Sequence, residues 1–149
     1  TCSSNNTSII TYGGWRQKEC PIQNVSMEQK CETMNGNVVL IPRYVFEKLG
    51  FNDIRYIHSI GDIEYGFRAS KYSIDIWTVP DVVGECEKRQ QDWKNCDKSL
   101  SVRFKNYWSR LGANPRNVFR LNFCYKGFCK ACLYFGSSFI HMLFPKLWR

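Results

Sequence analysis

A histidine, two acids and an arginine fall within the eleven residues from His58 to Arg68. An ionised carboxylate can take a proton from a hydroxyl group while the hydroxyl oxygen attacks an electrophile. Asp62 is the candidate for this chemistry, because the pattern predicts a helix from about Ser59 that places it in the first turn. There the helix dipole and unpaired backbone N–H groups favour a charged carboxylate. The alternative is that Asp62 only caps the helix.

The rest of this segment allows two interpretations. Glu64 precedes Arg68 by four residues, the favoured order for an ion pair on one helical face. The pair can belong to a site, or it can be a surface salt bridge that contributes about 0.3–0.5 kcal/mol. Gly66 inside a helix costs about 1 kcal/mol relative to alanine, which indicates close approach by a backbone or a ligand. His58 can orient a partner or a phosphate, or it can be structural.

Two glycine-containing segments stand upstream of this helix. Asn35-Gly36-Asn37 offers amide groups suited to sugar hydroxyls, although an ordinary turn is the alternative. The apolar run Val38–Ile41 follows it and predicts a strand buried on both faces. Gly13-Gly14 closes a short strand over residues 8–12.

The remaining pattern predicts an α/β chain up to about residue 84 and helices after it. Pro42 and Gly50 bound a helix with apolar residues Tyr44, Val45, Phe46 and Leu49. In the next helix Ile60, Ile63 and Phe67 form the predicted apolar stripe, whereas Asp62 and Tyr65 point elsewhere. A loop or broken helix is expected over 15–32, a strand over 74–79, a brief extended piece at 82–83, and helices over 99–111, 114–126 and 128–147.

Composition leaves several partners open. The 149 residues suffice for a hydrophobic core, and the net charge of +8 permits contact with nucleic acid, anionic lipid or phosphorylated ligands. No block of five or six consecutive basic residues occurs, which argues against a nucleic-acid-binding tail. Neither a signal peptide nor an apolar run of the ~18 residues needed for a membrane span is found, so we expect a cytoplasmic protein.

Eight cysteines stand at irregular spacings. Without a signal peptide we expect buried free thiols in a reducing compartment rather than a disulfide framework. Cys129 and Cys132 have the C-x-x-C spacing of half a zinc site, with Cys124 and His141 nearby. A zinc-stabilised module is therefore an alternative, but no second pair completes a tetrahedral ligand set, and the expectation is no metal in this chain.

Five segments of the chain resemble a known family when taken together: residues 10–14 (ITYGG), 33–43 (TMNGNVVLIPR), 45–50, 58–69 (HSIGDIEYGFRA) and 76–84. Their order and spacing are similar to those in the C-terminal half of family 2 glycosyltransferases, the large inverting GT-A group. The likeness covers roughly residues 8–86 and weakens after Trp93. It implies an α/β fold, the C-terminal half of a GT-A (Rossmann-like) domain over 1–90, followed by a basic, aromatic-rich helical tail over 91–149.

In that family an acidic pair opens a helix, and its second acid deprotonates the acceptor hydroxyl. The pair maps onto Gly61-Asp62, so the resemblance implies that Asp62 is the catalytic base and that glycine replaces the first acid. Gly84-Glu85-Cys86 stands where many members carry a histidine. The residues expected to bind acceptor or substrate are Gly13, Gly14, Asn35, Gly36, Asn37, His58, Gly61, Glu64, Tyr65 and Arg68.

The family holds its nucleotide sugar and a Mg²⁺ or Mn²⁺ ion with an N-terminal half that ends in Asp-x-Asp. No such motif follows a strand here. The resemblance therefore implies an acceptor-side fragment that binds no metal and transfers no sugar alone. The expected partners of the full-length enzyme are a nucleotide sugar and a glycan or lipid-linked acceptor, not nucleic acid, in polysaccharide synthesis at the cytoplasmic face of a membrane.

The alternative is a non-enzymatic binding module. Residues 99–149 are basic and rich in aromatic side chains. Such a segment can dock on an anionic membrane or on a protein partner, and peripheral membrane contact is compatible with an enzymatic role as well.

Overall fold

The computed structural model describes residues 1–4, 9–16, 21–23, 26–56, 58, 60–88 and 90–148. The chain divides into two compact units. The first contains Thr1–Ile54 and Gly61–Arg89, and the second contains Arg55–Ile60 and Gln90–Arg149. The predicted boundary between residues 90 and 91 lies one residue from this division, whereas the grouping of Arg55–Ile60 with the second unit was not predicted.

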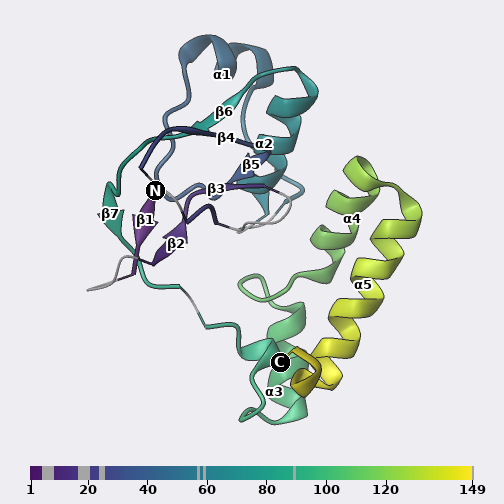
Figure 1. Cartoon of the computed structure of the whole chain (residues 1–149). Helices are drawn as coiled ribbons and strands as arrows, with labels where there is room; N and C mark the ends of the chain where they lie inside the picture. Colours follow the sequence, from purple (N-terminus) through teal and green to yellow (C-terminus); the bar gives the residue numbers. More distant parts are fainter. Residues whose placement is uncertain are drawn as a thin grey trace. The chain divides into compact units, whose positions relative to one another are not determined.

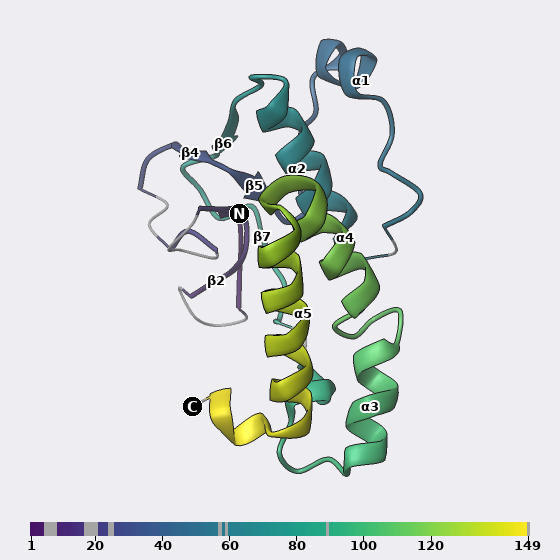
Figure 2. The same cartoon turned by 90° about the vertical axis from the view of Figure 1, so that its right-hand side faces the viewer.

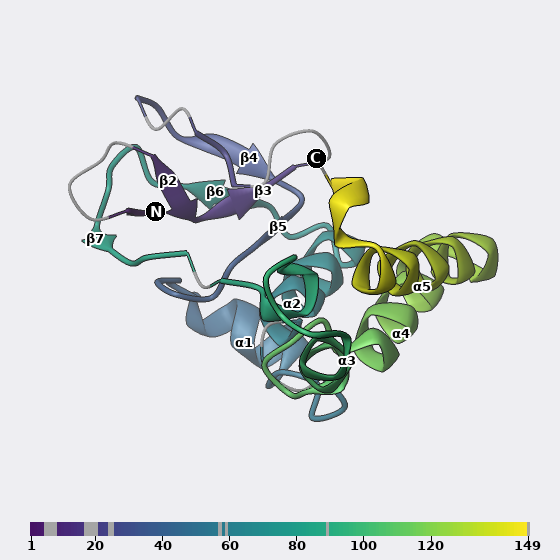
Figure 3. The same cartoon turned by 90° about the horizontal axis from the view of Figure 1, so that it is seen from below.

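Short strands form three small sheets in the first unit. In the first sheet β1 lies between β2 and β7, antiparallel to β2 and parallel to β7 (Figure 1). The pairs β3–β5 and β4–β6 are antiparallel (Figure 3). The strands are β1 (Cys2–Ser3), β2 (Ile10–Tyr12), β3 (Gly14–Trp15), β4 (Gln29–Cys31), β5 (Thr33–Met34), β6 (Ile76–Thr78) and β7 (Gly84–Glu85).

Two helices complete the first unit, α1 (Arg43–Leu49) and α2 (Gly61–Lys71). Pro42 precedes α1, and Gly50 ends it with φ 71°, a left-handed conformation that glycine adopts without strain. Helix α2 begins at Gly61, and Ser59, near which its start was predicted, lies outside the described residues. Val45, Leu49, Tyr65 and Ala69 form the core between the two helices, with Met34, Ile74 and Ile76 packed against it.

Three sequence predictions for this unit are wrong. The segment Val38–Ile41 is not a buried strand but irregular and exposed, with Leu40 92% accessible. Tyr65 does not point away from the core but lies in it, because α2 turns Glu64, Tyr65 and Ala69 inward. The segment 15–32 is not entirely loop, since its described part contains β4. Tyr44 and Phe46 of α1 are exposed, so that helix buries only half of its predicted apolar face.

The second unit is helical. Its predicted helices are found as α3 (Leu100–Trp108), α4 (Pro115–Lys126) and α5 (Phe128–Leu143), with the 3₁₀ turns η1 (Asp92–Lys94) and η2 (Pro145–Trp148). Helices α4 and α5 form an antiparallel hairpin that turns at Gly127, φ 87° (Figure 2). The buried core of the second unit contains Trp93 of η1, Tyr107 of α3 and Met142 of α5. The described residues form a mixed α/β chain, which confirms the predicted fold class; the three small sheets were not predicted, and the GT-A arrangement stays a prediction.

Candidate functional site

Asp62 lies in the first turn of α2, as predicted, and its carboxylate is held by two backbone groups. The N–H of Gly36 donates to Oδ2 at 2.6 Å, and the N–H of Ile63 donates to Oδ1 at 2.9 Å. The side chain is half-buried. A carboxylate offers about four acceptor positions, so about two remain for a further donor after these two bonds. Asp62 therefore caps the helix and keeps the capacity to accept a hydroxyl hydrogen.

The Asn35–Asn37 turn adjoins both Asp62 and the end of β2. The N–H of Asn35 donates to the carbonyl of Gly13 at 3.0 Å. The Nδ2 group of Asn37 donates to the Cys86 thiol sulfur at 3.3 Å. A Cβ on Gly36 would lie 3.0 Å from Cβ of Asp62, so this position favours glycine. The structure thus brings together four predicted elements of the site: Gly13, the turn, Asp62 and the start of α2.

A cavity of about 410 Å³ lies beside this turn within the first unit. Five of the predicted acceptor-binding residues line it: Gly13, Gly14, Asn35, Asn37 and Tyr65. Asp62 and Gly36 are not among the lining residues. The other walls are mostly apolar and include Val38–Ile41, Val45 and Ile76. The cavity therefore has the mostly apolar lining, with a few polar groups, that is usual for small-molecule pockets.

Tyr65 contributes a buried hydroxyl to this region. The residue is 4% exposed, and its hydroxyl oxygen has no hydrogen-bond partner among the described residues. An unsatisfied buried hydroxyl destabilises a fold by about 1–3 kcal/mol. Tyr65 is also one of the residues that line the cavity.

Glu64 and Arg68 form a buried ion pair rather than the surface salt bridge that was the alternative. Arg68 Nη2 lies 3.1 Å from Glu64 Oε2, and the two side chains are 20% and 6% exposed. The Arg68 guanidinium also donates to the carbonyl of Leu49 at 2.7 Å and to that of Phe51 at 3.0 Å. These bonds attach α2 to the end of α1. The pair therefore positions the helix that carries Asp62, and substrate contact by either residue stays a prediction.

Gly66 is the point at which α2 approaches β5, as the glycine inside the helix indicated. A Cβ on Gly66 would overlap Oγ1 of Thr33 and lie 2.8 Å from Cα of Thr33. The Thr33 hydroxyl donates to the Ile63 carbonyl at 2.8 Å. The approaching group is a backbone rather than a ligand, and it fixes the distance between the helix and the strand that leads to the turn.

Gly66→Ala is expected to destabilise the first unit by about 1–3 kcal/mol, because overpacking at Thr33 exceeds the gain in helix propensity. Gly136→Ala in α5 is the matched control, since a Cβ there meets nothing within 4 Å. It should leave stability unchanged or raise it by up to about 1 kcal/mol. Urea unfolding monitored by hydrogen exchange of α2 and α5 peptides measures both. Equal effects of the two substitutions would contradict the packing of Gly66 on Thr33.

His58 belongs to the second unit and is exposed. Its φ of 61° is left-handed, and its carbonyl accepts the N–H of Ile60 at 2.6 Å. A role beside Asp62 stays a prediction. Gly61 is buried as the first residue of α2. The contact between Asn37 and Cys86 was not predicted. Cys86 stands in the segment where the family resemblance pointed to a histidine. No sequence pattern signals a hydrogen bond between an amide and a thiol 49 residues apart.

The cysteines correct the expectation of buried thiols. Cys2 and Cys31 are buried, but Cys96, Cys124, Cys129 and Cys132 are exposed, and all are free; Cys20 lies outside the described residues. Burial raises the pKa of the Cys31 thiol, against smaller lowering effects of the Thr78 backbone and Arg16. In the described part of the chain no three His, Cys, Asp or Glu side chains gather as a metal site requires, so the zinc alternative lacks a ligand set there.

Comparison of the chain with protein-family models, curated proteins and solved structures gave no significant match. The likeness to family 2 glycosyltransferases therefore rests on the sequence segments alone.

Proposed function

We propose that the chain is the acceptor-side part of an inverting, family 2-like GT-A glycosyltransferase. Asp62 takes the proton of an acceptor hydroxyl as that oxygen bonds to the anomeric carbon of a nucleotide-activated sugar. The bond from the anomeric carbon to the diphosphate oxygen breaks, and the nucleoside diphosphate leaves. The observation that supports this proposal is the Asp62 carboxylate at the start of α2, bonded to Gly36 in the turn between Asn35 and Asn37.

The surroundings of Asp62 favour a base of fixed position. Gly36 and Ile63 hold both carboxylate oxygens, and the Glu64–Arg68 pair attaches the same helix to α1. A base contributes most when its geometry is set before the substrate arrives. The cavity adjoins the turn that bonds to Asp62, and its mostly apolar walls suit an acceptor that carries an apolar part, such as a lipid-linked glycan.

The segment Val38–Ile41 supports a nucleotide-binding half that packs on this unit. Its four residues are branched aliphatic side chains, yet all four are exposed. No hydrogen bond between described residues involves their backbone. In the proposed enzyme a strand of the other half pairs with the backbone of this segment, and other parts of that half pack over its side chains. The Mg²⁺ or Mn²⁺ ion that the resemblance implies finds no ligand cluster among the described residues, so the proposal assigns it to that half.

The test is sugar transfer by the full-length protein. A panel of nucleotide sugars is offered with glycan and lipid-linked acceptors, and release of nucleoside diphosphate is measured. The expected result is acceptor-dependent release and a product with the opposite anomeric configuration, seen by NMR. The chain of 149 residues serves as the control and should be inactive. Transfer with retained configuration, or a folded full-length protein inactive on every donor, would reject the proposal.

A further inference from the structure

The net positive charge of the chain comes from its last third. No aspartate or glutamate follows Asp97. The residues before Lys98 carry 11 Lys or Arg and 13 Asp or Glu, so all of the net positive charge comes from residues 98–149. The bases of residues 98–149 are Lys98, Arg103, Lys105, Arg110, Arg116, Arg120, Lys126, Lys130, Lys146 and Arg149. A segment of this length without one acid attracts a negatively charged surface.

The turn between α4 and α5 adds exposed apolar side chains to this charge. Phe128 is 62% exposed and Leu133 is 71% exposed, and Phe123 and Tyr134 are about half exposed. They are not isolated. The Phe123 and Phe128 rings lie 6.3 Å apart, and both contact Phe119 of α4. These four exposed residues, together with Lys126 and Lys130, are here called the hairpin tip.

The lysines of the hairpin tip lie among its apolar side chains. Lys126 Nζ is 4.9 Å from the centre of the Tyr134 ring. Lys130 precedes Leu133 by three residues on α5, so the two side chains are neighbours on one helical face. Long basic side chains can bury their methylene stems in an apolar layer while the charge stays in water. This mixture of aromatic, aliphatic and basic side chains matches the boundary between lipid headgroups and acyl chains.

We propose that the hairpin tip inserts into the surface of an anionic bilayer. Lys126 and Lys130 contact the acidic headgroups, the other basic residues of 98–149 add only long-range attraction that salt screens, and Phe123, Phe128, Leu133 and Tyr134 enter the interface. Insertion is peripheral. Among the described residues no helix is long and apolar enough to cross a membrane.

Two other occupants fit less well. A second copy of the chain would bring the same acid-free surface against itself, and the like charges would repel. A nucleic acid would match the charge and could stack on the exposed rings, but it would leave Leu133, the most exposed apolar side chain of the tip, without an apolar partner. Anionic lipid satisfies the charge and the aliphatic side chains together.

The experiment is co-sedimentation of the full chain with phosphatidylcholine vesicles that contain or lack phosphatidylserine. The expected result is binding only with phosphatidylserine, and weaker binding as salt is raised. Near an anionic surface each Lys or Arg contributes about 1 kcal/mol, so Lys126→Glu combined with Lys130→Glu should raise the vesicle Kd at least about tenfold. Phe128→Ser combined with Leu133→Ser should raise it to a similar extent without changing the charge.

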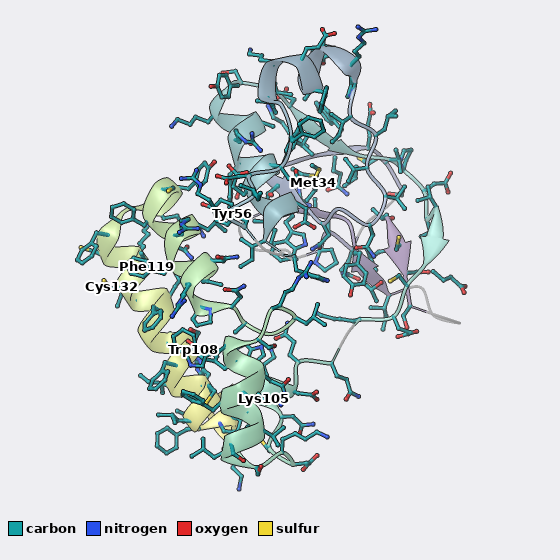
Figure 4. The ribbon with its side chains drawn as sticks, turned by 180° about the vertical axis from the view of Figure 1, so that it is seen from behind. Met34, Tyr56, Lys105, Trp108, Phe119 and Cys132 are labelled. Carbon is teal, nitrogen blue, oxygen red and sulfur yellow. The ribbon has the colours of Figure 1, made fainter. Side chains whose placement is uncertain are left out.

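Matched controls separate the tip from general charge and hydrophobicity. Lys98→Glu with Lys105→Glu makes the same change of charge away from the hairpin turn. Lys98 precedes α3, and Lys105 lies on α3, as Figure 4 shows. Leu40→Ser with Phe51→Ser removes a leucine and a phenylalanine of the first unit that are even more exposed, at 92% and 81%. Both controls should change the Kd less than about threefold. Equal losses in control and tip variants, equal binding to vesicles without phosphatidylserine, or tighter binding to a single-stranded oligonucleotide than to vesicles would overturn the proposal. None of these measurements depends on sugar transfer.

Discussion

Asp62→Asn is expected to lower kcat of the full-length enzyme by about 10²–10⁴, the usual contribution of a general base. Asparagine keeps one oxygen, which can accept the Gly36 N–H but not the Ile63 N–H as well, so the turn should stay in place and the start of α2 loses one hydrogen bond. It cannot accept the proton of the acceptor hydroxyl. Because Asp62 acts on the reacting oxygen, the loss should fall on kcat, with little change in KM for the nucleotide sugar.

Asp97→Asn is the matched control for this substitution. Asp97 is exposed in the second unit and also lies just before a helix, and its backbone N–H donates to Oδ1 of Asn95, whereas its carboxylate accepts no hydrogen bond from a described residue. It should leave kcat unchanged. Circular dichroism and hydrogen exchange of α2 verify that Asp62→Asn is folded. A folded Asp62→Asn enzyme with full turnover would remove the catalytic role of Asp62 and leave it as a helix cap.

The helices were predictable from sequence because their signals are local. Pro42 and Gly50 bound α1, and Asn114-Pro115 opens α4, within one or two residues of each prediction. The face that a helix buries is not local. Periodicity groups Ile60, Ile63 and Phe67, of which Ile60 is buried, but it does not reveal that packing on Val45 and Leu49 also turns Tyr65 inward. Such a choice depends on residues 16–20 positions away, which a helical pattern does not contain.

The strands were the least predictable elements for a related reason. Val38–Ile41 has a strong strand composition but finds no sheet neighbour among the described residues. Polar Gln29 and Lys30 form a strand because β6 lies opposite, with Thr78 accepting the Gln29 N–H at 3.0 Å. Met34, at the end of β5, packs on the core of the first unit (Figure 4). Pairing partners decide these segments, and composition alone cannot supply them.

The candidate site was predictable in part. The position of Asp62 in a first turn followed from the helical pattern, whereas its bond to Gly36 joins segments 26 residues apart. That proximity came only from the family resemblance. The roles of Glu64 and Arg68 could not be assigned from their spacing, because the same i, i+4 pattern describes an exposed and a buried pair. The carbonyls of Leu49 and Phe51 decide between the two.

Tyr107→Ala is expected to destabilise the second unit by about 3–5 kcal/mol, the range for removing a buried aromatic side chain. Tyr107 is 0% exposed. Its ring lies 5.7 Å from Trp93, 5.6 Å from Trp108 and 6.0 Å from Phe139, all in edge-to-face arrangements. Alanine would leave a cavity where α3, α5 and η1 meet. Urea unfolding followed by hydrogen exchange of α3 and α5 peptides measures the loss, and α2 peptides serve as the internal control.

Tyr107→Phe separates the ring from its hydroxyl. The hydroxyl lies 2.8 Å from Ser138 Oγ, which also donates to the Phe135 carbonyl at 2.9 Å. Because Ser138 keeps that second bond, phenylalanine should cost only about 1 kcal/mol near neutral pH. Burial raises the pKa of the Tyr107 phenol above its ordinary value of 10.0, more than the bond to Ser138 lowers it. The folded state therefore favours the protonated phenol.

The raised pKa of Tyr107 predicts that the stabilities of the wild type and of Tyr107→Phe depend differently on pH in alkaline solution. A raised pKa stabilises the fold fully below the unfolded value, and this contribution disappears as pH rises through the folded value. Wild-type stability should therefore fall above pH 10.0, whereas Tyr107→Phe has no phenol at this position and should fall less. The difference between them should shrink as pH rises, measured by urea midpoints for the second unit. Parallel pH profiles would mean that the phenol is not buried against Trp93 and Phe139.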